Sequence, residues 1–125
     1  MKKSYETLEQ IAFFDYLKLA KKELVPYVMH IPNEGKRNVW IGKQLKDMGM
    51  RPGVSDIFAA VPRGTYHGLW IELKAKRADG RYGKATIEQL IFIDDMLHQG
   101  YQAKVCNGCD EAIRVLLEYL GGAPF

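Results

Sequence analysis

Two apolar segments decide the fold: Asp56-Ile57-Phe58-Ala59-Ala60-Val61 and Leu69-Trp70-Ile71-Glu72-Leu73. Both are short and rich in β-branched or aromatic residues, and both are apolar enough to lie at the centre of a sheet. Residues 62–68, between them, contain a proline and two glycines, which favour a turn. The sequence therefore predicts a hairpin of two central strands.

Six further segments surround this hairpin. Apolar residues at helical spacing predict helices over residues 4–24, 39–48, 86–99 and 110–120, and β-prone runs predict strands over residues 27–31 and 101–106. The order α-β-α-β-β-α-β-α predicts an α/β fold in which a sheet of about four strands has helices on both faces.

Length and composition fit one globular domain spanning residues 1–125, because 125 residues are too few for two adequate cores. A 47% hydrophobic and 26% charged composition excludes a disordered tail or a fibrous chain. No apolar run approaches the roughly 18 residues that span a bilayer, and the first residues lack the apolar stretch of a signal peptide. Two cysteines are too few for a disulfide framework. We expect a soluble cytoplasmic protein without a membrane partner.

Charge is unevenly distributed along the chain. The net charge is only +3, but residues 36–84 hold 11 of the 18 Lys and Arg residues and 4 of the 15 Asp and Glu residues. From residue 85 onward, six acids stand against two bases. A basic middle suggests a polyanion as partner, and chance clustering on a solvated surface explains the same asymmetry.

Ionisable residues interrupt the predicted hairpin. Glu72 and Lys74 are two positions apart on one strand, so their side chains project from the same face. Asp56 opens the preceding strand and meets them at one end of the sheet if the strands pair. Two carboxylates and a lysine suit a hard divalent cation and an activated water. The same spacing also fits an edge strand with a solvated Glu-Lys pair.

Five segments carry a resemblance to a known family. In chain order they are Ile31–Arg37, Pro52–Asp56, Gly68–Lys74, Gln89 and Gly100–Cys106. Together they resemble the VRR-NUC family of the PD-(D/E)XK nuclease superfamily, over about residues 6–120. The sequence departs from the superfamily pattern at Ser55, where proline is expected. The resemblance implies a restriction-endonuclease-like core with a central mixed sheet, of the stand-alone type found in phages and bacteria.

The resemblance also implies a chemistry. It predicts a metal-dependent endodeoxyribonuclease that hydrolyses phosphodiester bonds with Mg²⁺, for which Mn²⁺ substitutes, and that needs no small-molecule cofactor. Asp56 and Glu72 would be metal ligands together with the backbone carbonyl of Leu73. Lys74 would position the attacking water.

Two further catalytic residues follow from the resemblance. Gln89 would point into the site, although Thr86-x-x-Gln89 is also a capping-box pattern. Glu6, one helical turn before Gln10, is the predicted acid of the first helix. Glu9 is the alternative, and either could be ordinary charge near a helix N-terminus.

The resemblance assigns DNA contacts to the basic middle of the chain. A phosphate-binding strip is predicted in a loop that leads into a helix, at Asn33, Lys36, Arg37, Lys43 and Lys46. A second basic cluster follows the strand of Glu72, at Lys76, Arg77, Arg81 and Lys84. A solvated loop would have the same composition.

The histidines and cysteines are assigned no chemistry. Cys106-x-x-Cys109 has half of the spacing of a zinc site, without a second pair. His30, His67 and His98 lie on separate predicted elements, without a nucleophile beside them.

We expect a homodimer that cleaves branched DNA, such as four-way Holliday junctions, in a bacterial or phage-infected cell. One domain has one hydrolytic centre, whereas junction resolution needs two symmetric nicks, which a twofold dimer supplies. The candidate contacts are Phe13, Phe14, Tyr16 and the C-terminal Pro124-Phe125, unless these residues are buried within one subunit. Two alternatives stay open: a nuclease for simple duplex, nicked or flapped DNA, and an inactive DNA-binding module of the same fold.

Overall fold

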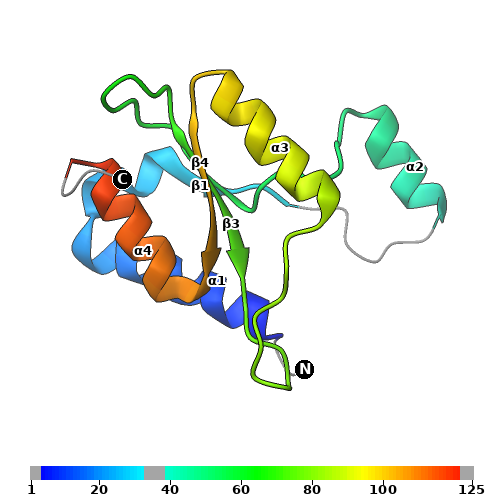
Figure 1. Cartoon of the computed structure of the whole chain (residues 1–125), viewed down its shortest axis with the longest axis horizontal. Coiled ribbons are helices and arrows are strands. Elements are labelled where there is room, and N and C mark those ends of the chain that lie inside the picture. The colour runs from blue at the N-terminus through cyan, green and yellow to red at the C-terminus, as the bar shows by residue number, and fades with distance from the viewer. Residues whose placement is uncertain (1–3, 33–38, 122–125) are drawn as a thin grey trace.

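The computed structural model describes residues 4–32 and 39–121. Its elements in chain order (Figure 1) are α1 (Tyr5–Ala20), the 3-10 helix η1 (Lys22–Tyr27), β1 (Val28–His30), α2 (Val39–Asp47), β2 (Ile57–Ala59), β3 (Leu69–Lys74), α3 (Ile87–His98), β4 (Gln102–Asn107) and α4 (Gly108–Tyr119). The predicted order of helices and strands is confirmed. Within the described ranges, no helix has the length and apolar character needed to cross a membrane.

The four strands form one mixed sheet in the order β1-β2-β3-β4. β1 and β2 are antiparallel, as are β2 and β3, where Phe58 lies opposite Trp70. β4 joins β3 in parallel after the crossover through α3. The predicted hairpin is therefore confirmed, and its two strands occupy the centre of the sheet.

Helices cover both faces of the sheet. In Figure 1, α4 and α3 lie on opposite sides of β4. Along β3, Leu69, Ile71 and Leu73 are buried in the core that α1 and α4 complete. The alternate residue Trp70 faces α3, where its ring lies 5.0 Å from that of Phe92. Because side chains alternate along a strand, Glu72 and Lys74 fall on the α3 side of β3.

The first helix is shorter than the sequence predicts. The Ser4 side chain caps it by accepting a hydrogen bond from the Thr7 N–H at 3.1 Å, but the helix ends at Ala20. Lys21 leaves the helical conformation with φ −138° and ψ 54°, and the chain tightens into η1. Leu17 and Leu24 are both buried, one on each side of the break. Their spacing of seven continues the helical pattern, which is why the sequence does not reveal the break.

Two of the aromatic residues predicted to form a contact surface, Phe13 and Phe14, pack within the subunit instead. Phe13 is fully buried, and its ring packs edge-on against Phe14, which itself packs against the core. Tyr16 is half-buried. The prediction that these side chains mediate dimerisation is wrong for Phe13 and Phe14, because the small core needs them. Residues 124–125 lie outside the described part of the chain.

A close backbone contact joins the turn before β2 to the first turn of α3. Gly53 has φ +82°, and a Cβ placed on it would lie 2.4 Å from the carbonyl oxygen of Glu88. Only glycine combines this conformation with this approach. The contact brings the segment that leads to Asp56, three residues after Gly53, against the backbone of Glu88 and Gln89.

Gly53→Ala should destabilise the protein by about 3 kcal/mol or more, because left-handed strain and a backbone clash add. Gly80 is a matched control, since it has the same φ of +82° but nothing within 4 Å of its would-be Cβ. Gly80→Ala should cost only about 1 to 2 kcal/mol of strain. Urea unfolding of both variants measures the difference. Equal losses would show that the Glu88 contact relaxes without cost.

Candidate functional site

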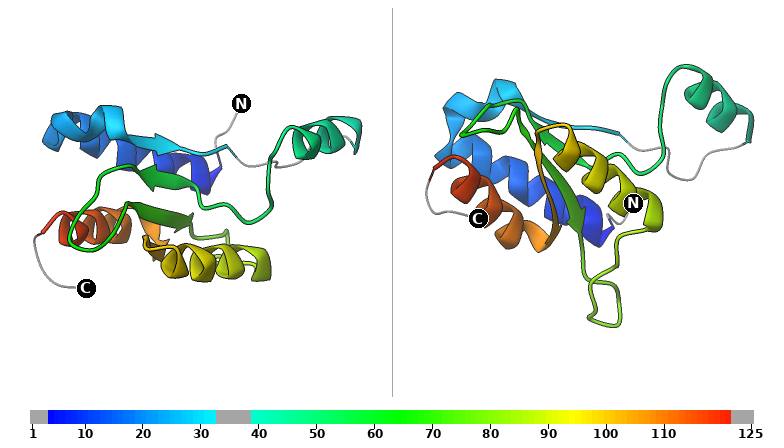
Figure 2. Two further views of the ribbon diagram at one scale, coloured as in Figure 1. Left: turned by 90° about the horizontal axis from the view of Figure 1, so that it is seen from above. Right: turned by 45° about the horizontal axis from the view of Figure 1, so that its top comes forward.

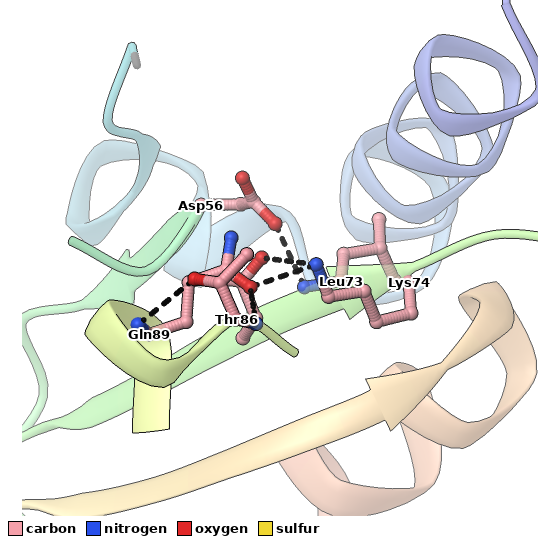
Figure 3. Close-up of polar contacts among 6 residues, drawn as sticks. Asp56, Leu73, Lys74, Thr86 and Gln89 are labelled. Atoms are coloured by element: carbon pink, nitrogen blue, oxygen red, sulfur yellow. Dashed lines mark hydrogen bonds and ion pairs between the residues drawn. The ribbon is translucent and has the colours of Figure 1, made fainter. Parts of the chain in front are cut away.

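Backbone groups of two neighbouring strands hold Asp56 at the start of β2. Its Oδ2 accepts a hydrogen bond of 2.8 Å from the Leu73 N–H of β3, as Figure 3 shows. Its backbone carbonyl accepts one of 2.8 Å from the Ile31 N–H and lies 2.9 Å from Nδ1 of His30, which must be the donor because a carbonyl only accepts. Asp56 is buried, so its carboxylate is fixed at one end of the sheet.

Few interactions compensate for the burial of the Glu72 carboxylate. Neither of its side-chain oxygens accepts a hydrogen bond in the described structure, and Lys74 Nζ lies 3.5 Å from Oε2. Burial and the charge of Asp56 raise the pKa of Glu72 to about 9, although Lys74 acts in the opposite direction. Buried polar atoms without a partner are rare in folded proteins and mark strain or a place for a ligand.

The raised pKa of Glu72 predicts pH-dependent stability in metal-free solution. The folded state retains this proton up to a pKa of about 9, whereas the ordinary value is 4.5. The stabilising contribution is therefore complete below about pH 4.5 and is lost as the pH rises through about 9. Thermal unfolding in EDTA should show a melting temperature that falls over this range, and Glu72→Gln should flatten the fall. The same slope in both proteins would contradict the prediction.

Gln89 serves the cap of α3 and the site together. Its Oε1 accepts hydrogen bonds from the Thr86 N–H at 2.9 Å and from Lys74 Nζ at 2.8 Å (Figure 3). The Thr86 hydroxyl accepts the reciprocal bond of 3.2 Å from the Gln89 N–H, so the predicted capping box is present. The two roles weighed from the sequence are not alternatives. The cap fixes the amide that in turn holds the Lys74 ammonium.

The two acids of α1 have different surroundings. Glu6 lines a cavity of about 350 Å³ together with Gln10, His30 and Asp56. Partial burial and the nearby charge of Asp56 raise the pKa of Glu6. Glu9 instead accepts a hydrogen bond of 2.6 Å from the Cys109 N–H in the first turn of α4. The structure therefore brings Glu6 to the cavity of Asp56, whereas Glu9 caps another helix.

The donor set fits a hard cation. Across the described residues, no three His, Cys, Asp or Glu side chains come together as metal ligands. A cation would rest on Asp56, Glu72 and a backbone oxygen, completed by water, which is how proteins commonly hold Mg²⁺. Because the N–H and C=O of a strand residue point to the same side, the Leu73 carbonyl faces the side from which its N–H reaches Asp56. The unbonded oxygens of Glu72 agree with such a site.

The predicted phosphate-binding strip is not assembled at this cavity. Asn33, Lys36 and Arg37 lie outside the described residues. Lys43 and Lys46 are exposed on α2, where Lys43 forms an ion pair of 3.0 Å with Asp47. Both views of Figure 2 show α2 standing away from the sheet and from the other helices. Lys43 and Lys46, the described residues of the strip, therefore stand away from the body that holds Asp56.

His30 is a residue of the cavity to which the sequence assigned no role. It is the last residue of β1, and it pairs with Ile57, the residue after Asp56. That antiparallel register places the imidazole beside the Asp56 backbone. His30 could have been identified only from the pairing of residues 27–31 with the strand that Asp56 opens. A single β-prone segment does not show which strand it pairs with.

One solved structure described as "VRR_NUC domain protein" is similar to the chain with a TM-score of 0.79 and 29% sequence identity. The similarity covers 96% of this chain and 91% of that chain. It confirms the predicted resemblance and the α/β fold with a four-stranded mixed sheet. No protein-family model and no curated protein matches the chain.

Proposed function

Because the chain has the fold of a VRR-NUC domain, we propose that it is a nuclease that hydrolyses DNA phosphodiester bonds with Mg²⁺ or Mn²⁺. The observation that carries the proposal is the buried pair Asp56 and Glu72, in which neither carboxylate oxygen of Glu72 accepts a hydrogen bond and Oε2 lies 3.5 Å from Lys74 Nζ. Burying two carboxylates costs stability. A module that only binds DNA has no use for that cost, so the pair favours an active enzyme over an inactive one.

Each residue of the site has a proposed task. Asp56, Glu72 and the Leu73 carbonyl would hold the metal ion, which when bound supplies Lewis-acid polarisation and a more acidic water. Lys74 Nζ would donate a hydrogen bond to the attacking water. Gln89 is a positioning residue, because its Oε1, 2.8 Å away, restrains that ammonium.

Glu6 adds an acceptor on the opposite wall. It lines the same cavity as Asp56, and its raised pKa makes it a better proton acceptor than an ordinary carboxylate. We therefore assign to Glu6 the orientation of a second water or the uptake of its proton.

The phosphate-binding strip would position the substrate. Lys43 and Lys46 on α2, with Asn33, Lys36 and Arg37 in the segment before it, supply cations and an amide of the kind that contacts DNA phosphates. Such contacts give affinity without sequence preference. The strip is therefore proposed to bind the DNA phosphate backbone.

We further propose that the enzyme acts on branched DNA as a twofold dimer, which would supply the two nicks of junction resolution. With Phe13 and Phe14 in the core, the proposed contact surface moves to α3. There Ile87, Leu90 and Ile91 are 74%, 51% and 55% exposed. Apolar side chains gathered on one helix face are typical of interfaces. Gln89 lies on the same helix, so a contact there would set the spacing of the two sites.

Cleavage of a substrate panel tests the proposal. Linear, flapped and four-way DNA are incubated with the protein in Mg²⁺, Mn²⁺ or EDTA. Cleavage should require a metal and should be fastest on the four-way substrate, with symmetric nicks. Equal rates on all substrates would contradict junction specificity alone, and binding without cleavage in both metals would favour the inactive module. Sedimentation velocity checks the dimer, since a monomer that makes paired nicks would contradict it.

A further inference from the structure

The segment between β3 and α3, residues 75–85, is a hydrogen-bonded ribbon, called here the basic hairpin. The Arg77 N–H donates to the Arg81 carbonyl at 2.8 Å, and the Gly80 N–H closes the turn onto the Arg77 carbonyl at 2.9 Å. Lys76 and Tyr82 pair across the ribbon as an antiparallel bridge. In Figure 1 the ribbon projects beyond the end of β3, beside the start of α1. It therefore has a defined shape that directly continues the strand of Glu72 and Lys74.

The base of the basic hairpin is anchored through Tyr82. The ring of this half-buried residue lies 5.6 Å from Lys76 Nζ. Its hydroxyl lies 3.2 Å from where a Cβ on Gly108 would be, at the start of α4. Tyr82 thus joins the ribbon to the body of the protein and limits the positions that its cations can take.

The charge of the basic hairpin is not neutralised by the protein. Its four cations are Lys76, Arg77, Arg81 and Lys84, and its one acid is Asp79. All four cations are exposed, and within residues 4–32 and 39–121 none of them forms an ion pair. Asp79 accepts a hydrogen bond of 2.9 Å from the Arg81 backbone N–H instead. An unpaired group of cations on a fixed ribbon is suited to a polyanion.

The basic hairpin borders the candidate site. Lys76 and Arg77 line a cavity of about 290 Å³ together with Lys74 and Glu6. Glu6 also lines the cavity of about 350 Å³ that contains Asp56. Ser4 and Glu6 line both cavities, which therefore adjoin. The two cavities together are called here the path: Asp56 and His30 line one part, Lys76 and Arg77 line the other, and Glu6 lies between them.

We propose that the basic hairpin binds backbone phosphates of the DNA strand that is cut, next to the phosphate at the metal-binding carboxylates. The inference rests on the proposed nuclease function and adds to it by stating where the cleaved strand lies on the protein. The acidic middle of the path repels an anion unless a cation is present, whereas its far end attracts the next phosphates along the strand. The basic hairpin holds the cleaved strand in place, whereas the predicted phosphate-binding strip binds phosphates at another part of the substrate.

The test compares two double variants that remove the same charge. Arg77→Ala with Arg81→Ala removes two cations of the basic hairpin. Lys18→Ala with Lys22→Ala removes two exposed cations, one in the last turn of α1 and one at the start of η1. Lys18 lies about 18 Å along the helix axis from Glu6. Fluorescence anisotropy with labelled DNA in EDTA gives the affinity between about 50 and 200 mM salt, and circular dichroism confirms that each variant is folded.

The hairpin variant should bind about tenfold more weakly, and its slope of log affinity against log salt should fall by about 1.8, or 0.9 for each lost phosphate contact. The control should change less than about twofold at 200 mM salt. Equal behaviour of the two variants would overturn the inference. If the natural protein neither binds nor cuts DNA, the proposed function itself fails, whereas intact cleavage with equal variants removes only the hairpin assignment.

Neutral phosphates locate the contact on the strand. Single methylphosphonates are placed at successive positions on either side of the cleaved bond. The natural protein should lose affinity at one or two adjacent positions, and the Arg77/Arg81 variant should show no further loss there. Losses of equal size in both proteins would show that other residues make these contacts, which contradicts the proposal.

Discussion

Asp56→Asn is expected to lower the rate of DNA cleavage by at least about 1000-fold, equivalent to about 4 kcal/mol of transition-state stabilisation. The substitution keeps an oxygen that can accept the Leu73 N–H, which Asp56 binds at 2.8 Å. The fold around β2 should therefore survive. The negative charge is lost, and with it a ligand for the proposed metal ion. DNA affinity should change little, because phosphate contacts dominate it.

Cleavage rates at saturating Mg²⁺, together with the melting temperature and the DNA affinity, measure the effect. Asp94→Asn is a control for charge, since Asp94 is an exposed acid on α3 whose partner is the exposed His98. It should keep nearly full activity. Glu72→Gln should match Asp56→Asn in activity but should also increase stability above neutral pH, because glutamine cannot ionise and so lacks the loss of stability that the raised pKa of Glu72 causes. Full activity of either site variant would place the site elsewhere.

Most of the fold was predictable because both strands of the central hairpin are mainly apolar and the segment between them contains a proline and two glycines. The predicted bounds of two helices were wrong, because the local sequence pattern does not show where the backbone changes conformation. Residues 17 and 24 continue the spacing of α1, although the backbone leaves the helix at Lys21. At α4, Asn107-Gly108 has the composition of a turn, and the helix begins at Gly108, two residues before the predicted start. Its φ of +86° explains why glycine stands there.

The grouping of Asp56, Glu72 and Lys74 was predictable because it needs only strand alternation and one hairpin. The choice between Glu6 and Glu9 was not, because it depends on a contact with Cys109, 100 residues away. His30 was missed for a similar reason: its place at the cavity follows from the register of β1 with β2. Local patterns therefore identified the residues on one hairpin. Residues that other elements bring to the hairpin could be identified only from the folded structure.

The basic hairpin and the exposed lysines of α2 lie outside an acidic centre formed by Asp56 and Glu72. A phosphate approaches these carboxylates only when a cation offsets their charge. Affinity and turnover should thus depend on different residues. Lys74 gives the clearest test of this separation between affinity and turnover, since it is a cation beside the buried carboxylates and not on the surface.

Lys74→Ala is expected to lower kcat by about 100 to 1000-fold while changing KM and DNA affinity little. Lys74 Nζ lies between Gln89 Oε1 at 2.8 Å and Glu72 Oε2 at 3.5 Å. Its side chain is 15% exposed, so it offers a free phosphate little surface. Its loss removes the donor proposed for the attacking water and leaves Glu72 without a nearby cation.

Lys43→Ala with Lys46→Ala is the contrasting variant, because both side chains are exposed on α2. It should raise Kd and flatten its dependence on salt while kcat at saturation stays the same. Single-turnover cleavage, with enzyme in excess, separates the two effects for both variants. A Lys74 variant that loses only affinity would contradict its assignment to the water. Partial recovery of kcat in Lys74→Arg would support it, since arginine restores a cationic donor in another shape.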